Sequence, residues 1–250
     1  MGAIIAVVNQ KGGVGKTTSA VNLTAALHEL GQRVLLCDFD PQANATSGFG
    51  ISRRPKKSSY DVIINGVPAR DLIVSTPWGD VIPSTPALAG ASVELTAMEQ
   101  REFVLKTALA PLRDAYDYLF IDCPPSLELL TLNALCACEQ ILIPVQCEYY
   151  ALEGLSDLMS TMRAVKRRLN PGLSIFGVLL TMYDGRTNFS NQVAQEIRRF
   201  FPGKVYSTAI PRNVRLAEAP SYGEPVLAYD RRSRGAEAYL DVAREILRRR

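Results

Sequence analysis

The sequence is short of the residues that mark secreted and membrane-spanning proteins. Its 250 residues include a single histidine, His28, which has no evident catalytic partner and to which we assign no role. No apolar run approaches the roughly 18 residues that span a bilayer. No signal-peptide layout precedes the first motif. We therefore expect a cytoplasmic protein with no stable membrane association.

Cysteine is also scarce, and its spacing does not fit a metal site. Zinc-binding cysteines occur as CxxC-like pairs with further ligands, whereas the closest pair here is separated by only one residue. The number is odd, and most of the cysteines lie in apolar runs, which favours buried free thiols. The five are Cys37, Cys123, Cys136, Cys138 and Cys147.

A strong excess of charge is lacking as well. The net charge is +3, with 21% charged and 47% hydrophobic residues, as in ordinary globular proteins. This mildly basic balance permits contact with nucleic acid without requiring it. The length fits one large α/β domain.

What the sequence does have is a regular alternation of apolar β-branched runs with helical patterns. Predicted strands cover residues 3–9, 33–40, 117–126, 139–146 and 174–184. Predicted helices cover residues 16–31, 129–138, 154–169, 191–201 and 235–250. The alternation predicts an α/β fold, a doubly wound, mostly parallel sheet flanked by helices. Residues 51–60 and 64–92, rich in Pro, Gly and Ser, are expected to be surface loops with short elements.

Four features fall where predicted strands end. These are Asp38, Asp40, Asp122 and the glycine-rich stretch after the first strand. Ligands of doubly wound sheets bind at the carboxyl ends of the strands. The convergence therefore predicts one ligand site at this edge of the sheet.

The glycine-rich stretch, "NQKGGVGKTTSAVNL", indicates a phosphate-binding loop between a strand and a helix. Backbone amides of such a loop face a phosphate chain, and the helix N-terminus adds positive potential. The lysine reaches the β- and γ-phosphates, and the following hydroxyl ligates Mg²⁺. The expected nucleotide contacts are Gly12, Gly13, Val14, Gly15, Lys16, Thr17 and Thr18.

Two details depart from the usual loop. Gln10 stands where the pattern has its first glycine, and a second lysine, Lys11, precedes the glycines. The residues alone do not explain this second lysine.

The three aspartates indicate metal and water chemistry. Asp122 follows an apolar strand, where a carboxylate holds Mg²⁺ directly or through water. Of Asp38 and Asp40, one would support Mg²⁺ and its waters, and the other would orient the water that attacks the γ-phosphate. A capping or purely structural role for one of these acids is the alternative.

Longer segments resemble one family. "KGGVGKTT" looks like a deviant Walker A motif, and "LLCDFDPQANAT" resembles the switch I segment of the ParA/Soj partitioning ATPases. "YDYLFIDCPPS" resembles their Walker B and switch II, and similar text continues through "PVQCEYYALEGL" and "IPRNVRLAEAPSYGEPVLAYDRRSRGAEAYLD". The resemblance runs from Ile4 to the last helix. It implies a P-loop NTPase of the deviant Walker A type, with residues 1–250 forming a single domain without a separate N-terminal DNA-binding domain.

The resemblance also implies a mechanism. Members form a two-fold dimer around two ATP molecules, in which Lys11 would reach the partner's phosphates. It assigns Asp38 and Asp122 with Thr17 to Mg²⁺, Asp40 to the hydrolytic water, and Pro211 and Asn213 to adenine. The family's activity is Mg²⁺-dependent hydrolysis of ATP to ADP, used as a slow switch.

Family resemblance further implies partners. The ATP dimer would bind double-stranded DNA without sequence preference, placing the protein on the nucleoid, and a ParB-like protein would stimulate hydrolysis and release. Arg186 and Arg215 match arginines that contact DNA in relatives. Basic clusters at residues 163–168, 211–215, 230–234 and 248–250 fit this view, although solvated helix faces are the alternative.

Two other functions share the same loop. A MinD-like membrane-associated division-site ATPase would end in an amphipathic lipid-binding helix, whereas residues 235–250 have the pattern of a docked helix with a charged end. A metabolic ATP-dependent enzyme would need a second substrate pocket, and an iron–sulfur reductase would need well-placed cysteine ligands. No motif for either is evident.

Overall fold

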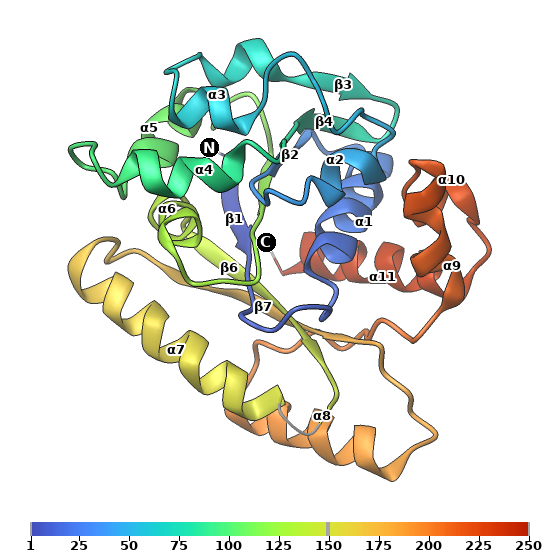
Figure 1. Ribbon diagram of the computed structural model, residues 1–250. Coiled ribbons are helices and arrows are strands. Elements are labelled where there is room, and N and C mark those ends of the chain that lie inside the picture. The colour runs from blue at the N-terminus through green and yellow to red at the C-terminus, as the bar shows by residue number, and fades with distance from the viewer. Residues whose placement is uncertain (1, 149–150, 250) are drawn as a thin grey trace.

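A seven-stranded β-sheet lies between two layers of helices (Figure 1) in the computed structural model, which describes residues 2–148 and 151–249. The spatial order of the strands is β3-β4-β2-β5-β1-β6-β7, and all pair in parallel except β3 with β4. The expected doubly wound, mostly parallel α/β class is therefore confirmed. The strands are β1 (Ala3–Val7), β2 (Val34–Asp38), β3 (Val74–Thr76), β4 (Gly79–Ile82), β5 (Tyr118–Asp122), β6 (Gln140–Gln146) and β7 (Ser174–Thr181).

The helices connect these strands and are mostly short. The longer ones are α1 (Lys16–Glu29), α4 (Leu88–Leu95), α6 (Leu129–Ala137), α7 (Ala151–Arg168), α8 (Asn188–Phe200) and α11 (Arg234–Arg248). The shorter ones are α2 (Asn44–Gly48), α3 (Ser59–Ile63), α5 (Val104–Leu109), α9 (Val214–Glu218) and α10 (Val226–Tyr229). Single turns of 3₁₀-helix are η1 (Ala69–Leu72), η2 (Ala110–Leu112) and η3 (Ala219–Tyr222).

One sequence prediction is wrong in part. Residues 64–92 were expected to be surface loops with short elements, but the short strand β4 in this range pairs with β2 inside the sheet. Val81 and Ile82 on β4 are fully buried. The sequence did not reveal this strand because its four residues, from Gly79 to Ile82, are too few to show a period of two.

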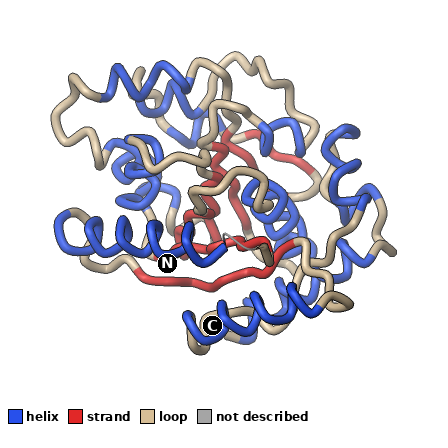
Figure 2. The backbone as a smooth tube through the Cα atoms, turned by 60° about the horizontal axis from the view of Figure 1, so that its bottom comes forward, coloured by secondary structure: helices blue, strands red, loops and turns tan. Residues whose placement is uncertain are grey.

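Alternate residues of the central strands pack into two separate cores, one on each face of the sheet. Ile4 and Ala6 face the core under α3 to α8, while Ile5 and Val7 face the core under α1, α2, α10 and α11. This follows from the period of two along a strand. Figure 2 shows the strands running between helices on both sides. A sheet covered on both faces leaves the ends of its strands as the place for a ligand.

The last helix, α11, is packed against the sheet and α1. Tyr239, Val242 and Ile246 are buried in the core that α1 shares, and the Tyr239 hydroxyl lies 3.1 Å from Ser19 Oγ. This matches the docked helix expected from the sequence. Among the described residues, none of the helices combines the length and the apolar character that crossing a membrane requires.

A buried carboxylate fixes α11 to the loop after α8. Glu245 is 7% exposed and accepts hydrogen bonds from the Ser207 amide at 3.0 Å, the Ser207 hydroxyl at 2.8 Å and the Thr208 amide at 3.3 Å. Arg249 Nη2 lies 2.6 Å from its Oε1. Burial alone would raise the pKa of Glu245, but these donors together hold it below 4.5.

We expect Glu245→Gln to destabilise the protein by about 2–3 kcal/mol, because buried donors lose their charged acceptor. Since the folded-state pKa is depressed, the stabilisation is present above pH 4.5 and is lost as pH falls through the folded value. The gap between wild type and variant in urea-denaturation midpoint should therefore narrow in acid. Asp241→Asn, which breaks an exposed pair with Arg244 on the same helix, is the control and should cost under about 1 kcal/mol. Equal losses for both variants would contradict this prediction.

Candidate functional site

The strand register places the candidate acids together at one edge of the sheet. Asp122 at the end of β5 lies opposite Val7 of β1 on one side and Asp38 of β2 on the other. The Phe39 amide continues the pairing with a 3.0 Å bond to the Asp122 carbonyl. The loop that follows β1 therefore lies beside both aspartates, as the sequence predicted.

The phosphate loop has the backbone shape that its glycines allow. Gly13 and Gly15 have φ angles of 74° and 87°, in the left-handed region that other residues avoid. Gly15 is the residue before α1, and its carbonyl accepts the first helical bond from Ser19 at 2.9 Å. The Thr181 hydroxyl donates to the Val14 carbonyl at 2.8 Å, which fixes the loop to β7. The loop thus presents the N-terminus of a 14-residue helix, a favourable position for phosphate.

Lys16 points back across its own loop. Its ammonium donates to the Lys11 carbonyl at 3.1 Å, and the residue is only 7% exposed. Burial lowers the pKa of Lys16, while the charges of Asp122 and Asp40 oppose that shift. A buried cation at the start of a helix is placed to bind an anion within the loop.

Asp122 is the residue whose bonding is most incomplete. It is fully buried, and among the described residues neither carboxylate oxygen has a hydrogen-bond partner of good geometry. Burial raises its pKa and the charge of Asp38 adds to the shift, while the nearby Thr17 hydroxyl and Lys16 oppose it. Buried carboxylates without partners are rare because they are costly. The carboxylate and hydroxyl are hard oxygen donors, so this pair fits Mg²⁺.

Within the described part of the chain, no group of three or more side chains forms a metal cage on its own. That agrees with Mg²⁺, which retains waters and binds through one or two carboxylates together with substrate phosphates.

Asp38 is already engaged by its own chain. Its Oδ2 accepts from the Thr46 amide at 2.7 Å and the Thr46 hydroxyl at 2.6 Å, and its Oδ1 accepts from the Asp40 amide at 3.2 Å. Burial raises its pKa to about 6 against the effect of these bonds. Asp38 therefore anchors α2 beside the site, and its expected support of Mg²⁺ remains a prediction.

Asp40 lies in the turn after β2, with 6% of its surface exposed. Its Oδ1 accepts from the Gln42 amide at 2.9 Å, and its carbonyl accepts from the Ser84 hydroxyl at 2.8 Å. Ser84 also donates its amide to the Thr46 hydroxyl at 2.8 Å. The carboxylate is thus held on a stiff turn near Lys16 and Asp122, with Oδ2 free of any hydrogen bond among the described residues.

Lys11 lies on the outer side of the loop and faces its own chain. Its ammonium is 2.7 Å from Glu148 Oε2, and both side chains are more than one-third exposed. The Lys11 amide donates to Asn9 Oδ1 at 3.0 Å, and Asn9 in turn donates to the Pro144 carbonyl at 2.8 Å. The two lysines of the motif therefore differ in environment: Lys16 is enclosed, and Lys11 is accessible from outside.

A hollow next to the loop contains the segment expected to hold adenine. It measures about 340 Å³, and Gly15, Thr18, Pro211 and Asn213 are among the residues that line it. Met182 on its wall has a φ of 49°, unusual for a residue with a side chain. The structure thus brings Pro211 and Asn213 beside the phosphate loop, from about 200 residues away in the chain.

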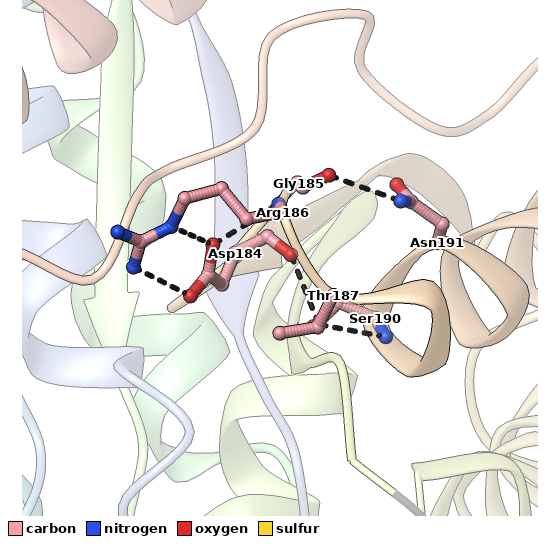
Figure 3. Close-up of polar contacts among 6 residues, drawn as sticks. All are labelled: Asp184, Gly185, Arg186, Thr187, Ser190 and Asn191. Carbon is pink, nitrogen blue, oxygen red and sulfur yellow. Dashed lines mark hydrogen bonds and ion pairs between the residues drawn. The ribbon is translucent and has the colours of Figure 1, made fainter.

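The two candidate DNA arginines are both exposed and both paired. Arg186 forms a two-pronged pair with Asp184 in the turn before α8, with Nε and Nη2 each 2.9 Å from a carboxylate oxygen (Figure 3). Arg215 on α9 lies 2.8 Å from Glu218 and 3.2 Å from Asp230. Bonds from Arg186 lower the pKa of Asp184 to about 2. The structure does not bring these arginines into the nucleotide site.

Sequence reasoning missed several residues around the site. The Thr46 hydroxyl donates to Asp38, and the Ser84 hydroxyl donates to the Asp40 carbonyl. The Glu148 carboxylate accepts from the Lys11 ammonium. Glu148 follows β6 by two residues, so the same argument that selected the acids at strand ends would have found it. Ser84 follows β4, the strand that was itself missed.

Together, the parallel sheet, the glycine loop and the enclosed lysine define a P-loop nucleotide-binding protein with a second, outward lysine. A family model described as an AAA domain matches residues 2–175. The sporulation initiation inhibitor protein Soj of Bacillus subtilis is 57% identical over 98% of both chains. The chromosome partitioning protein ParA of Myxococcus xanthus is 51% identical over all of this chain and 89% of its own. The chain belongs to the ParA/Soj family of partitioning ATPases.

Solved structures show the same fold. A structure described as cobyrinic acid a,c-diamide synthase from Mycobacterium smegmatis, with bound ATP analogue and magnesium, superimposes with a TM-score of 0.87 at 36% identity, covering 99% and 95% of the two chains. The cell division ATPase MinD of Pyrococcus furiosus gives 0.82 at 29% identity over the full length of both. The expected ligands, ATP or ADP with Mg²⁺, are confirmed by such neighbours.

Proposed function

We propose that the protein is a DNA-partitioning ATPase that acts as a nucleotide-dependent dimer. One observation carries the proposal: a complete phosphate loop already has its enclosed Lys16, yet Lys11 stands outside it, accessible to a second molecule. A two-fold pairing would make the exchange of Lys11 reciprocal. Each Lys11 would add positive charge to the partner's phosphates where the transition state develops negative charge.

In this proposal, the residues at the carboxyl edge of the sheet have separate roles in ATP hydrolysis. Lys16 and the amides of Gly12 to Thr18 hold the phosphates, and Pro211 and Asn213 hold the base. Asp122 and Thr17 hold Mg²⁺, with Asp38 in support, and Mg²⁺ supplies charge neutralisation on the phosphates. Asp40 orients the attacking water with its free Oδ2. Turnover is slow in this scheme, because the site is complete only while two copies are joined.

We propose that the protein binds DNA and that its protein partner is ParB-like. The dimer would bind double-stranded DNA through phosphates, without sequence preference, with Arg186 and Arg215 at the contact. For such a contact, each DNA phosphate would have to displace the carboxylate that is paired with the arginine. The free-energy cost is small, because ion pairs exposed to water are weak. In this scheme residues 1–250 work as a single ATPase domain on the cytoplasmic nucleoid.

A membrane-associated MinD-like role receives less support. A lipid-binding terminal helix needs a free apolar face, whereas the apolar residues of α11, such as Tyr239 and Ile246, are buried against α1. Relatives from Myxococcus xanthus and Caulobacter vibrioides, 51% and 49% identical to this chain, are named chromosome partitioning protein ParA.

The Mycobacterium smegmatis structure is described as a diamide synthase. Forming an amide in this way needs a source of ammonia. Release from glutamine uses a reactive thiolate, and thiolates require a lowered pKa. All five cysteines are buried, and burial raises the pKa of Cys136 and Cys147 to about 11. None of the five cysteines therefore combines the exposure and the lowered pKa that favour a reactive thiolate.

The proposal predicts that ATP with Mg²⁺, but not ADP, converts the protein from monomer to dimer. Only the ATP form should bind duplexes of unrelated sequence, with affinity falling steeply between roughly 50 and 200 mM salt. Light scattering and fluorescence anisotropy measure the two effects. Equal sizes in ATP and ADP would refute the dimer, and tight binding insensitive to salt would refute phosphate-based contact.

A further inference from the structure

A short loop between α2 and α3 carries several positive charges and no negative charge, near the edge of the sheet that forms the candidate nucleotide site. Residues 53–57 read Arg-Arg-Pro-Lys-Lys, with four cations, no acid, and all four charged residues exposed. We call this segment the basic loop. Across the part of the chain that the structure describes, none of its four cations has an ion pair.

The exposed arginines already considered differ from it in this respect. Arg186 is held by Asp184, and Arg215 is held by both Glu218 and Asp230. A paired guanidinium contributes little net field, because the carboxylate offsets it at short range. The four cations of the basic loop, in contrast, are exposed and have no carboxylate at ion-pair distance among the described residues.

Gly50, three residues before the basic loop, lies close to Gly223, which directly follows η3. Gly50 and Gly223 both have a φ of 69°, and a Cβ added at Gly223 would lie 2.8 Å from Gly50 Cα. A hollow of about 360 Å³ between the two segments is lined by Arg53 on one side and by Ser221 and Glu224 on the other. The basic loop and the segment that carries Arg215 are thus parts of one continuous surface.

The basic loop is also tied to the nucleotide edge. Arg53 Nη2 donates to Asn44 Oδ1 at 3.0 Å and to Ser47 Oγ at 3.1 Å, both on α2. In the same helix, Thr46 is the residue that binds Asp38. A shift of Asp38 or α2 on nucleotide binding would move the basic loop with it.

We infer that the basic loop is a DNA-phosphate contact, and that Arg54, Lys56 and Lys57 supply charge that the paired arginines do not. The inference rests on the proposed function and adds to it a contact in the loop between α2 and α3, whereas Arg186 lies in the turn before α8. Charge complementarity with the phosphate backbone and continuity with the Arg215 segment carry the assignment. Arg53 links this contact to α2.

Anionic lipid is the other polyanion that lysines and arginines bind. Stable membrane attachment needs apolar side chains or a lipid anchor in addition to charge. The basic loop offers none, since Ile51 before it is half-buried and Ser58 after it caps α3. DNA is therefore the occupant that fits.

The test is a triple variant, Arg54→Ala with Lys56→Ala and Lys57→Ala, which leaves Arg53 in place. Binding of the ATP-bound full chain to duplexes of two unrelated sequences is measured by anisotropy across a salt series. We expect affinity to fall tenfold or more at about 100 mM salt, and the salt slope to drop by about 0.9 for each phosphate that the variant no longer neutralises. ATP hydrolysis without DNA and the melting temperature should stay unchanged.

A second triple variant, Arg70→Ala with Lys106→Ala and Lys204→Ala, removes the same charge from exposed sites elsewhere and should bind DNA almost as wild type does. If wild type does not bind DNA at all, the proposed function fails and this inference with it. If wild type binds and the loop variant shows the same affinity and slope, only the inference is overturned. Loss of binding to phosphatidylglycerol vesicles with unchanged DNA binding would overturn it in favour of lipid.

Discussion

Replacing Lys11 with alanine should leave nucleotide binding intact and abolish both ATP-dependent dimerisation and hydrolysis. The phosphates of the same chain are held by the glycine loop and Lys16, and Lys16 bonds to Lys11 through its backbone carbonyl and not through its side chain. Affinity for ATP should thus change by no more than about twofold to threefold. Hydrolysis should fall by at least about 100-fold, since a cation supplied in trans is worth 10³–10⁵ in related chemistry. Equilibrium binding of a fluorescent nucleotide, light scattering and phosphate release give the three readouts.

Lys204→Ala is the matched control, because it removes one exposed lysine away from the site and should behave as wild type. Lys11→Arg keeps the charge but changes its shape, and should retain part of the dimerisation. Dimers of Lys11→Ala that form with ATP would remove the basis for a trans role. A large loss of nucleotide affinity would instead place Lys11 at the phosphates of its own chain.

The Asp40→Ala variant should bind ATP, accumulate as a dimer and hydrolyse ATP at least about 100 times more slowly, in line with the contribution of a positioned acid or base. The turn should survive the change. The Asp40 carbonyl remains bound by Ser84, and Asp38 remains bound to Thr46. The expected pattern is therefore a trapped dimer with a normal melting temperature, measured by single-turnover hydrolysis and light scattering.

Asp71→Ala removes an exposed carboxylate on η1 and serves as the control. If Asp40→Ala hydrolyses ATP at a rate within a factor of a few of wild type, then a residue other than Asp40 orients the attacking water. Failure to dimerise would indicate that Asp40 acts in assembly before it acts in chemistry.

The parts of the fold that the sequence predicted are those with strong local signals. β1, the glycine loop and α1 follow one another with a strand pattern, two glycines of positive φ and a helical pattern. Asp38 and Asp122 were placed together because parallel strands end at the same edge. Such inferences need only local periodicity and the geometry of βαβ units.

What the sequence did not predict depends on contacts between distant segments. Glu148 meets Lys11 across 137 positions, and Gly50 meets Gly223 across a still longer span. β4 is too short to show a pattern and is a strand because β2 and β3 offer it hydrogen-bond partners. The pairing of Arg215 with Asp230 likewise could not be read from a run of basic residues.

The Lys11–Glu148 pair has a consequence for the energetics of assembly. In the single chain the lysine already has a counter-ion at 2.7 Å, so reaching a second molecule exchanges one ion pair for another instead of adding one. The net electrostatic gain is a difference between two similar terms, and ionic strength weakens both terms together. A dimer built this way would be only marginally favoured and readily reversed once the γ-phosphate is gone. Such a balance would suit the proposed cycle, in which two copies associate with ATP and separate after hydrolysis.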